Sequence, residues 1–143
     1  MYKLCNKKNQ LAACVLSLCW FSGASNAGVV IVNAKSPVTI TKEEAAKIFL
    51  GKMKKFADGT TIIVVKNAAD KELRKTFCEK VLGRSLQQTD IYWSQMLFTG
   101  KASPPKELNN PGEAKQFVAQ TPGAITYVAD DAVDASVLVV YKF

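Results

Sequence analysis

Two short runs of β-branched residues, separated by a stretch with helical periodicity, constrain the fold of this chain most strongly. Residues 29–32 are Val-Val-Ile-Val and residues 62–65 are Ile-Ile-Val-Val. Continuous apolar runs of this length are typical of strands that are buried on both faces. Such strands belong to sheets that helices cover on both sides. We therefore expect an α/β fold with a mostly parallel sheet and helices on both faces.

Helix-start signals divide the rest of the chain into four predicted helices. Thr41 with Glu44 three residues later, and Ser85 with Gln88, form capping boxes, in which side chain and backbone satisfy each other's hydrogen bonds. The four predicted N-cap residues are Thr41, Asp70, Ser85 and Asn110. The second helix carries a buried stripe at Leu73, Phe77 and Val81 and ends at Gly83. The fourth buries Ala114, Phe117 and Val118.

The third helix has apolar residues on more than one side. Leu86, Trp93, Met96 and Leu97 fall on one face, and Ile91 and Phe98 form a second seam. We therefore expect this helix to be packed on two sides. A loop over 100–110, with two adjacent prolines, is expected to follow it.

Two further strands are predicted near the end of the chain, over 124–128 and 137–141. A short acidic loop containing Asp130, Asp131 and Asp134 joins them. A short connection of this kind allows the two strands to pair antiparallel at an edge of the sheet.

The N-terminal segment has the pattern of a cleavable secretory signal. Its first ten residues hold three lysines and no acid, an apolar run covers 11–21, and small residues follow to Ala27. We expect a signal peptide over 1–27 and a single domain over 28–143, located in the periplasm, with no membrane span after cleavage. The apolar run is shorter than the roughly 20 residues of a membrane anchor. A lipoprotein signal at Cys14 or Cys19 is a rival that fits less well.

Cleavage changes the composition that matters for function. It removes three of the 19 basic residues, and 16 against 12 acidic residues leaves a net charge of +4. A modest positive charge favours anionic partners or surfaces, and secretion argues against nucleic acid as a partner. Cys78 becomes the single cysteine, so no internal disulfide can form. We expect this thiol to be a small buried hydrophobic group and not a catalytic one.

The sequence lacks the residues of the common catalytic and cofactor sites. It contains no histidine, which excludes Ser-His-Asp and Cys-His catalysis and most zinc sites. It also contains no Gly-rich phosphate loop of the GxGxxG or GxxxxGK type. We therefore expect no enzyme activity, no metal and no cofactor.

Basic residues around the start of the second helix form a candidate anion site. Lys66 and Asn67 leave the carboxyl end of a buried strand, where open α/β sheets place their ligands. Lys71 and Arg74 are three residues apart in the first helical turns. The predicted anion-binding residues are therefore Lys66, Asn67, Lys71 and Arg74. The alternative is a solvated charged face, with Asp70 already capping the helix.

Several longer strings resemble a known group of proteins. They are IFLGKMKKFADGT (48–60), LRKTFCEKVLG (73–83), YWSQMLFTGKASPPKEL (92–108) and TPGAITYV (121–128). Together they are similar to small periplasmic-binding-protein-like proteins, often labelled substrate-binding proteins of phosphate ABC transporters. The resemblance covers nearly all of the chain after residue 27. It implies one lobe of a type II periplasmic-binding-protein-like fold.

Two departures from that group bear on phosphate binding. Its full-length members hold phosphate in a loop that contains Ser-Gly-Thr, whereas this chain has Lys-Asn-Ala-Ala-Asp-Lys-Glu-Leu at 66–73. Those members also close two lobes over the solute, and a chain of this length supplies one. Tight binding would need a second copy, a partner protein or a different site.

The sequence leaves two function classes open. The first is a solute-binding module for phosphate or a related oxyanion, linked to ABC transport. The second is an interaction or sensor-adaptor protein that keeps the lobe without binding a solute. A transporter or sensor protein is the expected partner in either case.

Overall fold

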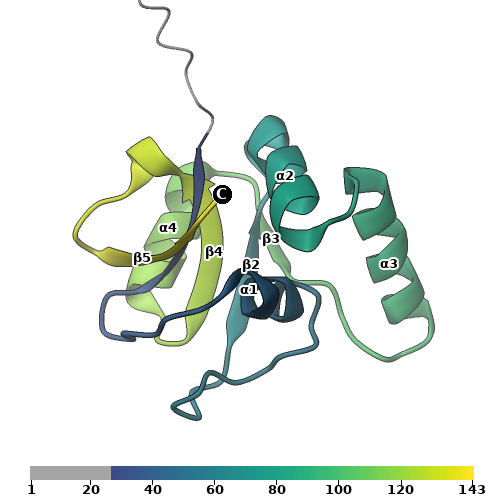
Figure 1. The fold of residues 1–143 in the computed structure, drawn as a ribbon, viewed down its shortest axis with the longest axis horizontal. Helices are drawn as coiled ribbons and strands as arrows, with labels where there is room; N and C mark the ends of the chain where they lie inside the picture. Colours follow the sequence, from purple (N-terminus) through teal and green to yellow (C-terminus); the bar gives the residue numbers. More distant parts are fainter. Residues whose placement is uncertain (1–26) are drawn as a thin grey trace, which may run out of the picture.

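The computed structural model describes residues 27–143, so the predicted signal peptide lies outside the described residues except for Ala27. Figure 1 shows one open sheet with helices packed around it. The strands are β1 (Gly28–Asn33), β2 (Ile63–Asn67), β3 (Lys106–Leu108), β4 (Ala124–Ala129) and β5 (Val137–Lys142). The helices are α1 (Lys42–Phe49), α2 (Lys71–Phe77), α3 (Leu86–Phe98) and α4 (Pro111–Gln120). A π-helical turn, η1 (Cys78–Leu82), extends α2, and a 3₁₀ turn, η2 (Asp130–Ala132), follows β4.

The strand order is β3-β2-β4-β1-β5. β2 pairs in parallel with β3 and β4, whereas β1 pairs antiparallel with β4 and β5. Every strand except β1 therefore runs in the same direction, which confirms the mostly parallel sheet.

The antiparallel pairing that the sequence allowed between the last two strands does not form, because β1 lies between them, although β5 is at an edge. β1 is buried along its whole length and so occupies an inner position with a neighbour on each side. The chain after β4 passes through η2 and crosses β1 to reach the far edge.

Alternating side chains of the inner strands build two hydrophobic cores, one on each face of the sheet. Val30 and Val32 of β1 pack with Ile125 and Tyr127 of β4 beneath α1 and α2. Val29 and Ile31, together with Ala124, Val128 and Val118 of α4, form the core on the opposite face. The prediction of helices on both faces is thereby confirmed, and the alternation is the two-residue period of a strand.

The edge strand beside β2, β3, is only three residues long, and the sequence did not predict it. β3 lies within the segment predicted as a loop and pairs only with Val65, Lys66 and Asn67. Ile63 precedes this pairing and remains 39% exposed, although the sequence predicted a fully buried run. β3 is short because the two prolines before it cannot donate to a strand ladder.

The local signals for the helix ends are confirmed. Both capping boxes form, at Thr41 before α1 and at Ser85 before α3. The Asp70 side chain accepts from the Leu73 amide at 2.9 Å, and Asn110 caps α4. Gly83 ends the π turn in the left-handed conformation. These signals are local, which is why the sequence identifies them.

The predicted packing of the third helix on two sides is wrong. Within the described chain, α3 buries only Thr89, while Ile91, Leu97 and Phe98 are exposed. Figure 1 shows α3 at the side of the molecule, away from the sheet. The apolar residues satisfied the pattern of a buried helix, but no second layer covers them among residues 27–143.

Gly123, in the turn before β4, has both a positive φ and a close backbone neighbour, whereas Gly59 has only the positive φ. Gly123 has φ +82°, and a Cβ there would lie 2.3 Å from the Thr61 carbonyl oxygen. Gly59 has φ +86°, and a Cβ there would meet nothing within 4 Å. We expect Gly123→Ala to lower the free energy of unfolding by about 1–3 kcal/mol more than Gly59→Ala, measured by urea denaturation. Equal losses would show that the close approach to Thr61 is not a constraint.

Candidate functional site

The carboxyl end of β2 is organised by a buried asparagine. Asn67 is 1% exposed and donates from Nδ2 to the Tyr127 carbonyl oxygen at 3.3 Å. Its Oδ1 accepts from the Ala69 amide at 3.2 Å, which turns the chain toward α2. Both ends of the amide are therefore used within the fold.

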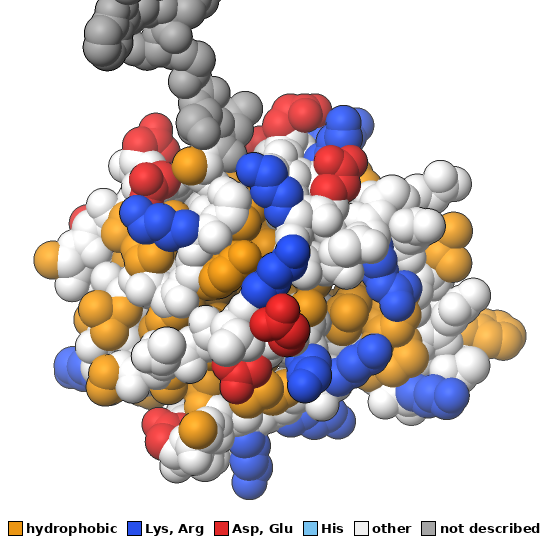
Figure 2. Space-filling view, in the orientation of Figure 1, with side chains coloured by type: hydrophobic (Ala, Val, Ile, Leu, Met, Phe, Trp, Pro, Cys, Tyr) orange, Lys and Arg blue, Asp and Glu red, His pale blue; other side chains and the backbone are white. Residues whose placement is uncertain are grey.

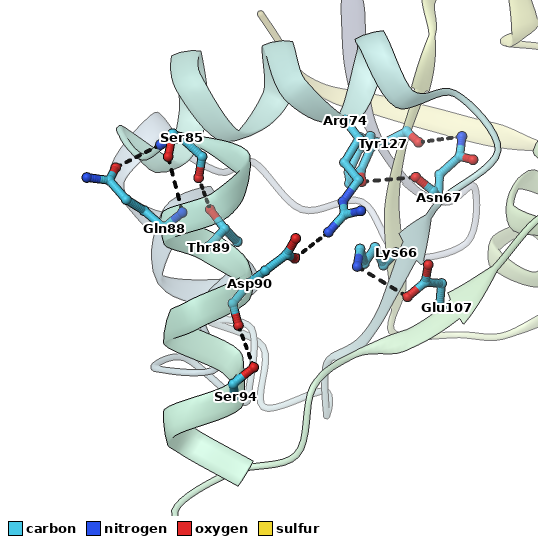
Figure 3. A network of polar contacts seen from close by, with 10 residues as sticks. All are labelled: Lys66, Asn67, Arg74, Ser85, Gln88, Thr89, Asp90, Ser94, Glu107 and Tyr127. Carbon is cyan, nitrogen blue, oxygen red and sulfur yellow. Dashed lines mark hydrogen bonds and ion pairs between the residues drawn. The ribbon is translucent and has the colours of Figure 1, made fainter. Parts of the chain in front are cut away.

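Tyr127 returns the contact from the neighbouring strand. Its hydroxyl donates to the Asn67 carbonyl oxygen at 3.0 Å, and its ring stacks on Phe77 with centroids 4.2 Å apart. Burial raises the pKa of the Tyr127 phenol well above its ordinary value, so the hydroxyl stays a donor at neutral pH. This reciprocal pair joins β2, β4 and α2 at one point (Figure 3).

Two cationic side chains, Lys66 of β2 and Arg74 of α2, are each held by an acid from another element. Lys66 Nζ lies 3.2 Å from the carboxylate of Glu107 on β3, and Arg74 lies 2.5 Å from Asp90 on α3. Figure 3 shows both pairs in the gap between α2, α3 and β3. The Lys66 and Arg74 side chains are 25% and 17% exposed.

A small cavity of about 30 Å³ lies beside these ion pairs. Its lining residues are Phe49, Lys66, Arg74, Cys78, Leu82, Thr89, Asp90, Trp93, Pro105 and Tyr127. This volume holds one or two waters and excludes a phosphate. Burial raises the pKa of the Cys78 thiol, which remains protonated and behaves as the small hydrophobe that the sequence suggested.

A larger hollow of about 750 Å³ opens at the start of α2. It is lined by Asn67, Ala69, Asp70, Lys71, Glu72, Leu73, Asn109, Val128, Ala129, Asp131 and Ala132. The volume is in the range of small-molecule sites. Its charged lining consists of three carboxylates and the ammonium group of Lys71.

The four residues predicted to bind an anion are thus divided between two places. Lys66 and Arg74 line the small cavity, whereas Asn67 and Lys71 line the larger hollow. The sequence did not identify Asp90, Glu107 or Tyr127 as members of this region. Their contacts span 16 to 60 residues along the chain, so no local spacing could have revealed them.

Residues 27–143 contain neither a metal-binding cluster nor a membrane-spanning helix. No group of three or more His, Cys, Asp or Glu side chains in this part of the chain is arranged to hold a metal ion. None of the helices described here combines the length and apolar character needed to cross a bilayer.

Comparison with known proteins agrees with the sheet topology. A family model described as the PBP superfamily domain matches residues 23–140. The chain belongs to this family. No protein of curated function matches the sequence significantly. Membership in this family establishes the fold in which the hollow lies, at the carboxyl ends of β2 and β4 and the start of α2.

Solved structures of binding proteins share the fold of this PBP-superfamily domain. An ABC-type phosphate transport receptor from Vibrio cholerae aligns with a TM-score of 0.61 at 22% identity, covering 80% of this chain and 45% of that one. A phosphate ABC transporter substrate-binding protein with bound phosphate, from Clostridium perfringens, aligns with a TM-score of 0.63 at 20% identity, covering 80% and 44%. PstS from Borrelia burgdorferi aligns at 0.59 and 13%, covering 80% and 46%. The chain spans less than half the length of these proteins.

Tyr127→Phe tests the reciprocal pair at the end of β2. We expect it to lower the free energy of unfolding at pH 8 by about 1–2 kcal/mol, because the buried Asn67 carbonyl loses its hydroxyl donor. The raised pKa of Tyr127 adds a pH dependence. Its stabilisation is complete below the unfolded-state pKa of about 10 and is lost as the pH rises above it.

The gap in stability between wild type and Tyr127→Phe should therefore narrow between pH 8 and pH 11, measured by chemical denaturation at each pH. A gap that stays constant over this range would contradict a buried, neutral Tyr127 hydroxyl.

Proposed function

We propose that this protein is a periplasmic solute-binding module for phosphate or a related small oxyanion, and that it works with an ABC transporter rather than as an enzyme. Residues 1–27 would be removed as a signal peptide, which leaves the single domain 28–143. The family and the phosphate-transport proteins that share the fold support this proposal. The solved structures support it through a shared fold alone, because their sequence identities to this chain are 22% and 20%.

The observation that carries the proposal is the position of the hollow at the start of α2. It lies where β2 and β4, two parallel neighbours, both end, as Asn67, Val128 and Ala129 in its lining show. Ligands of open α/β sheets bind at the carboxyl ends of the strands. The hollow therefore combines the right place in the sheet with sufficient volume.

The residues proposed to bind the anion are Asn67 and Lys71, which line the hollow, and Lys66 and Arg74, which line the small cavity and are reached only when Glu107 or Asp90 moves away. Lys66 and Arg74 already hold carboxylates, but Glu107 and Asp90 are about half exposed. An incoming oxyanion would displace one of these carboxylates and take its place on Lys66 or Arg74. Glu107 and Asp90 would then compete with the anion and lower its affinity.

Calorimetric titration of the purified protein with phosphate and with sulfate at low salt tests this function. We expect binding that Lys71→Ala/Arg74→Ala weakens about tenfold or more, since each charged hydrogen bond contributes about 1.5–3 kcal/mol. Lys52→Ala/Lys55→Ala is the matched control, because it removes two exposed cations after α1 and should leave the affinity unchanged. The absence of heat at millimolar anion, or equal affinity in both double mutants, would refute the assignment.

The second candidate is a protein that keeps the fold and binds a partner instead of a solute. The carboxylates of Asp70, Glu72 and Asp131 around the hollow favour it, because they repel an anion and outnumber Lys71. Retention of one transporter or sensor protein from a periplasmic extract, together with silent anion titrations, would support this candidate. Anion binding without any retained protein would count against it.

A further inference from the structure

Lys66 and Arg74 converge on one small space from two neighbouring elements. Both side chains line the small cavity described above, and Asp90 of α3 lines it as well. Figure 3 shows Arg74 reaching from α2 toward α3, with Lys66 of β2 next to it. Two cations that face one cavity favour an anion between them, and Asp90 and Glu107 supply that negative charge in this structure.

The cavity is too small for the oxyanion proposed above. Its volume of about 30 Å³ is that of one or two waters. A phosphate can contact Arg74 and Lys66 together only after one wall of the cavity has moved outward. Binding at these two cations therefore requires a movable wall.

α3 is the wall of the cavity that is least firmly held. It buries only Thr89, and none of its residues belongs to either hydrophobic core of the described domain. It is tied to the rest of the domain by the Asp90–Arg74 pair and by the Tyr92 hydroxyl, which donates to the Leu50 carbonyl oxygen at 2.7 Å. Figure 2 shows hydrophobic side chains projecting at the right edge of the molecule, where Figure 1 places α3, so its outer side faces solvent. α3 can therefore move outward without disrupting a packed core.

We propose that α3 is a lid, which the Asp90–Arg74 ion pair holds closed over Lys66 and Arg74 and which an oxyanion opens by taking the place of the Asp90 carboxylate. The inference rests on the proposed function and deepens it, because it states how the two partly buried cations become accessible. In the closed form, Asp90 is an internal substitute for the anion. In the open form, the anion binds Arg74 and Lys66 in its place.

The other carboxylate at this place, Glu107, does not belong to a movable element. Its strand, β3, pairs with Val65, Lys66 and Asn67 in a parallel ladder. The Glu107 side chain can turn away from Lys66, but its backbone stays attached to the sheet. Asp90 instead moves with its helix, so displacement of this one carboxylate changes the position of a whole element.

A lid makes the anion affinity depend on how often α3 is open. For a ligand that binds only the open form, the apparent dissociation constant is the intrinsic one divided by the open fraction. A variant that loosens α3 should therefore tighten anion binding by the same factor by which it raises the open fraction. Simple competition between Asp90 and the anion, without movement of α3, predicts no such effect from a contact that carries no charge.

Cys78 provides a reporter of the open fraction. It is buried, and it lines the small cavity together with Thr89 and Trp93 of α3. Movement of α3 away from the cavity would expose this thiol to solvent. The rate at which iodoacetamide alkylates Cys78, measured by mass spectrometry of the peptide that contains it, should therefore follow the opening of α3.

Tyr92→Phe tests the lid without changing any charge. It removes the hydroxyl that bonds α3 to the Leu50 carbonyl oxygen. We expect alkylation of Cys78 to become about two- to tenfold faster, the range for one lost hydrogen bond. The dissociation constant for inorganic phosphate, measured by calorimetry, should become smaller by the same factor. Tyr141→Phe is the matched control, because Tyr141 lies on β5, at the far edge of the sheet, and this variant should change neither quantity.

Inorganic phosphate should also speed the alkylation of Cys78 in the wild-type protein, compared with sodium chloride at equal ionic strength. Phosphate binding that Tyr92→Phe leaves unchanged, or phosphate that slows alkylation, would overturn the lid and leave the proposed function standing. The absence of heat with phosphate in both wild type and Tyr92→Phe would refute the proposed function, and with it the anion as the opening ligand. In that case, faster alkylation of Tyr92→Phe alone would still support the movement of α3.

Discussion

The buried contact between Asn67 and Tyr127 is the constraint on which the candidate site depends. Each residue donates from its side chain to the other's backbone carbonyl, at 3.3 and 3.0 Å. Leaving either buried group unpaired would cost about 1–3 kcal/mol, so the two strand ends are held in one arrangement. The same asparagine turns the chain into α2, and the tyrosine ring supports that helix through Phe77. The position of the hollow at the start of α2 follows from this contact.

β3 and α3 are tied to this point by ion pairs whose acids are partly exposed. Lys66–Glu107 joins β3 to β2, and Arg74–Asp90 joins α3 to α2, but both acids are about half exposed. α3 is further held by the Tyr92 hydroxyl, which donates to the Leu50 carbonyl oxygen at 2.7 Å. Asp90 lines the small cavity and lies on the exposed side of α3. A ligand that displaced this carboxylate would therefore remove one of the contacts that hold α3 to α2.

The hollow and the exposed side of α3 differ in chemical character. The hollow has a suitable position and volume, but its carboxylates compete with any anion for Lys71. The exposed side of α3 carries the apolar side chains of Ile91, Leu97 and Phe98 instead. The chain spans less than half the length of the binding proteins that share its fold.

The sequence by itself determined the features that depend on neighbouring residues. Thr41, Asp70, Ser85 and Asn110 start the four helices as predicted, because a cap bonds within its own first turn. The β-branched run of β1 also predicted a buried strand correctly. Only the tertiary structure decided that β1 lies between β4 and β5 and that the Asn67 side chain bonds to Tyr127. It also decided that Arg74 pairs with Asp90 and does not share one site with Lys71. Within residues 27–143, it also left Ile91, Leu97 and Phe98 of α3 exposed, against the apolar pattern of this helix. These outcomes depend on contacts between distant parts of the chain, and a local pattern shows that a side chain is apolar or charged without showing what it meets.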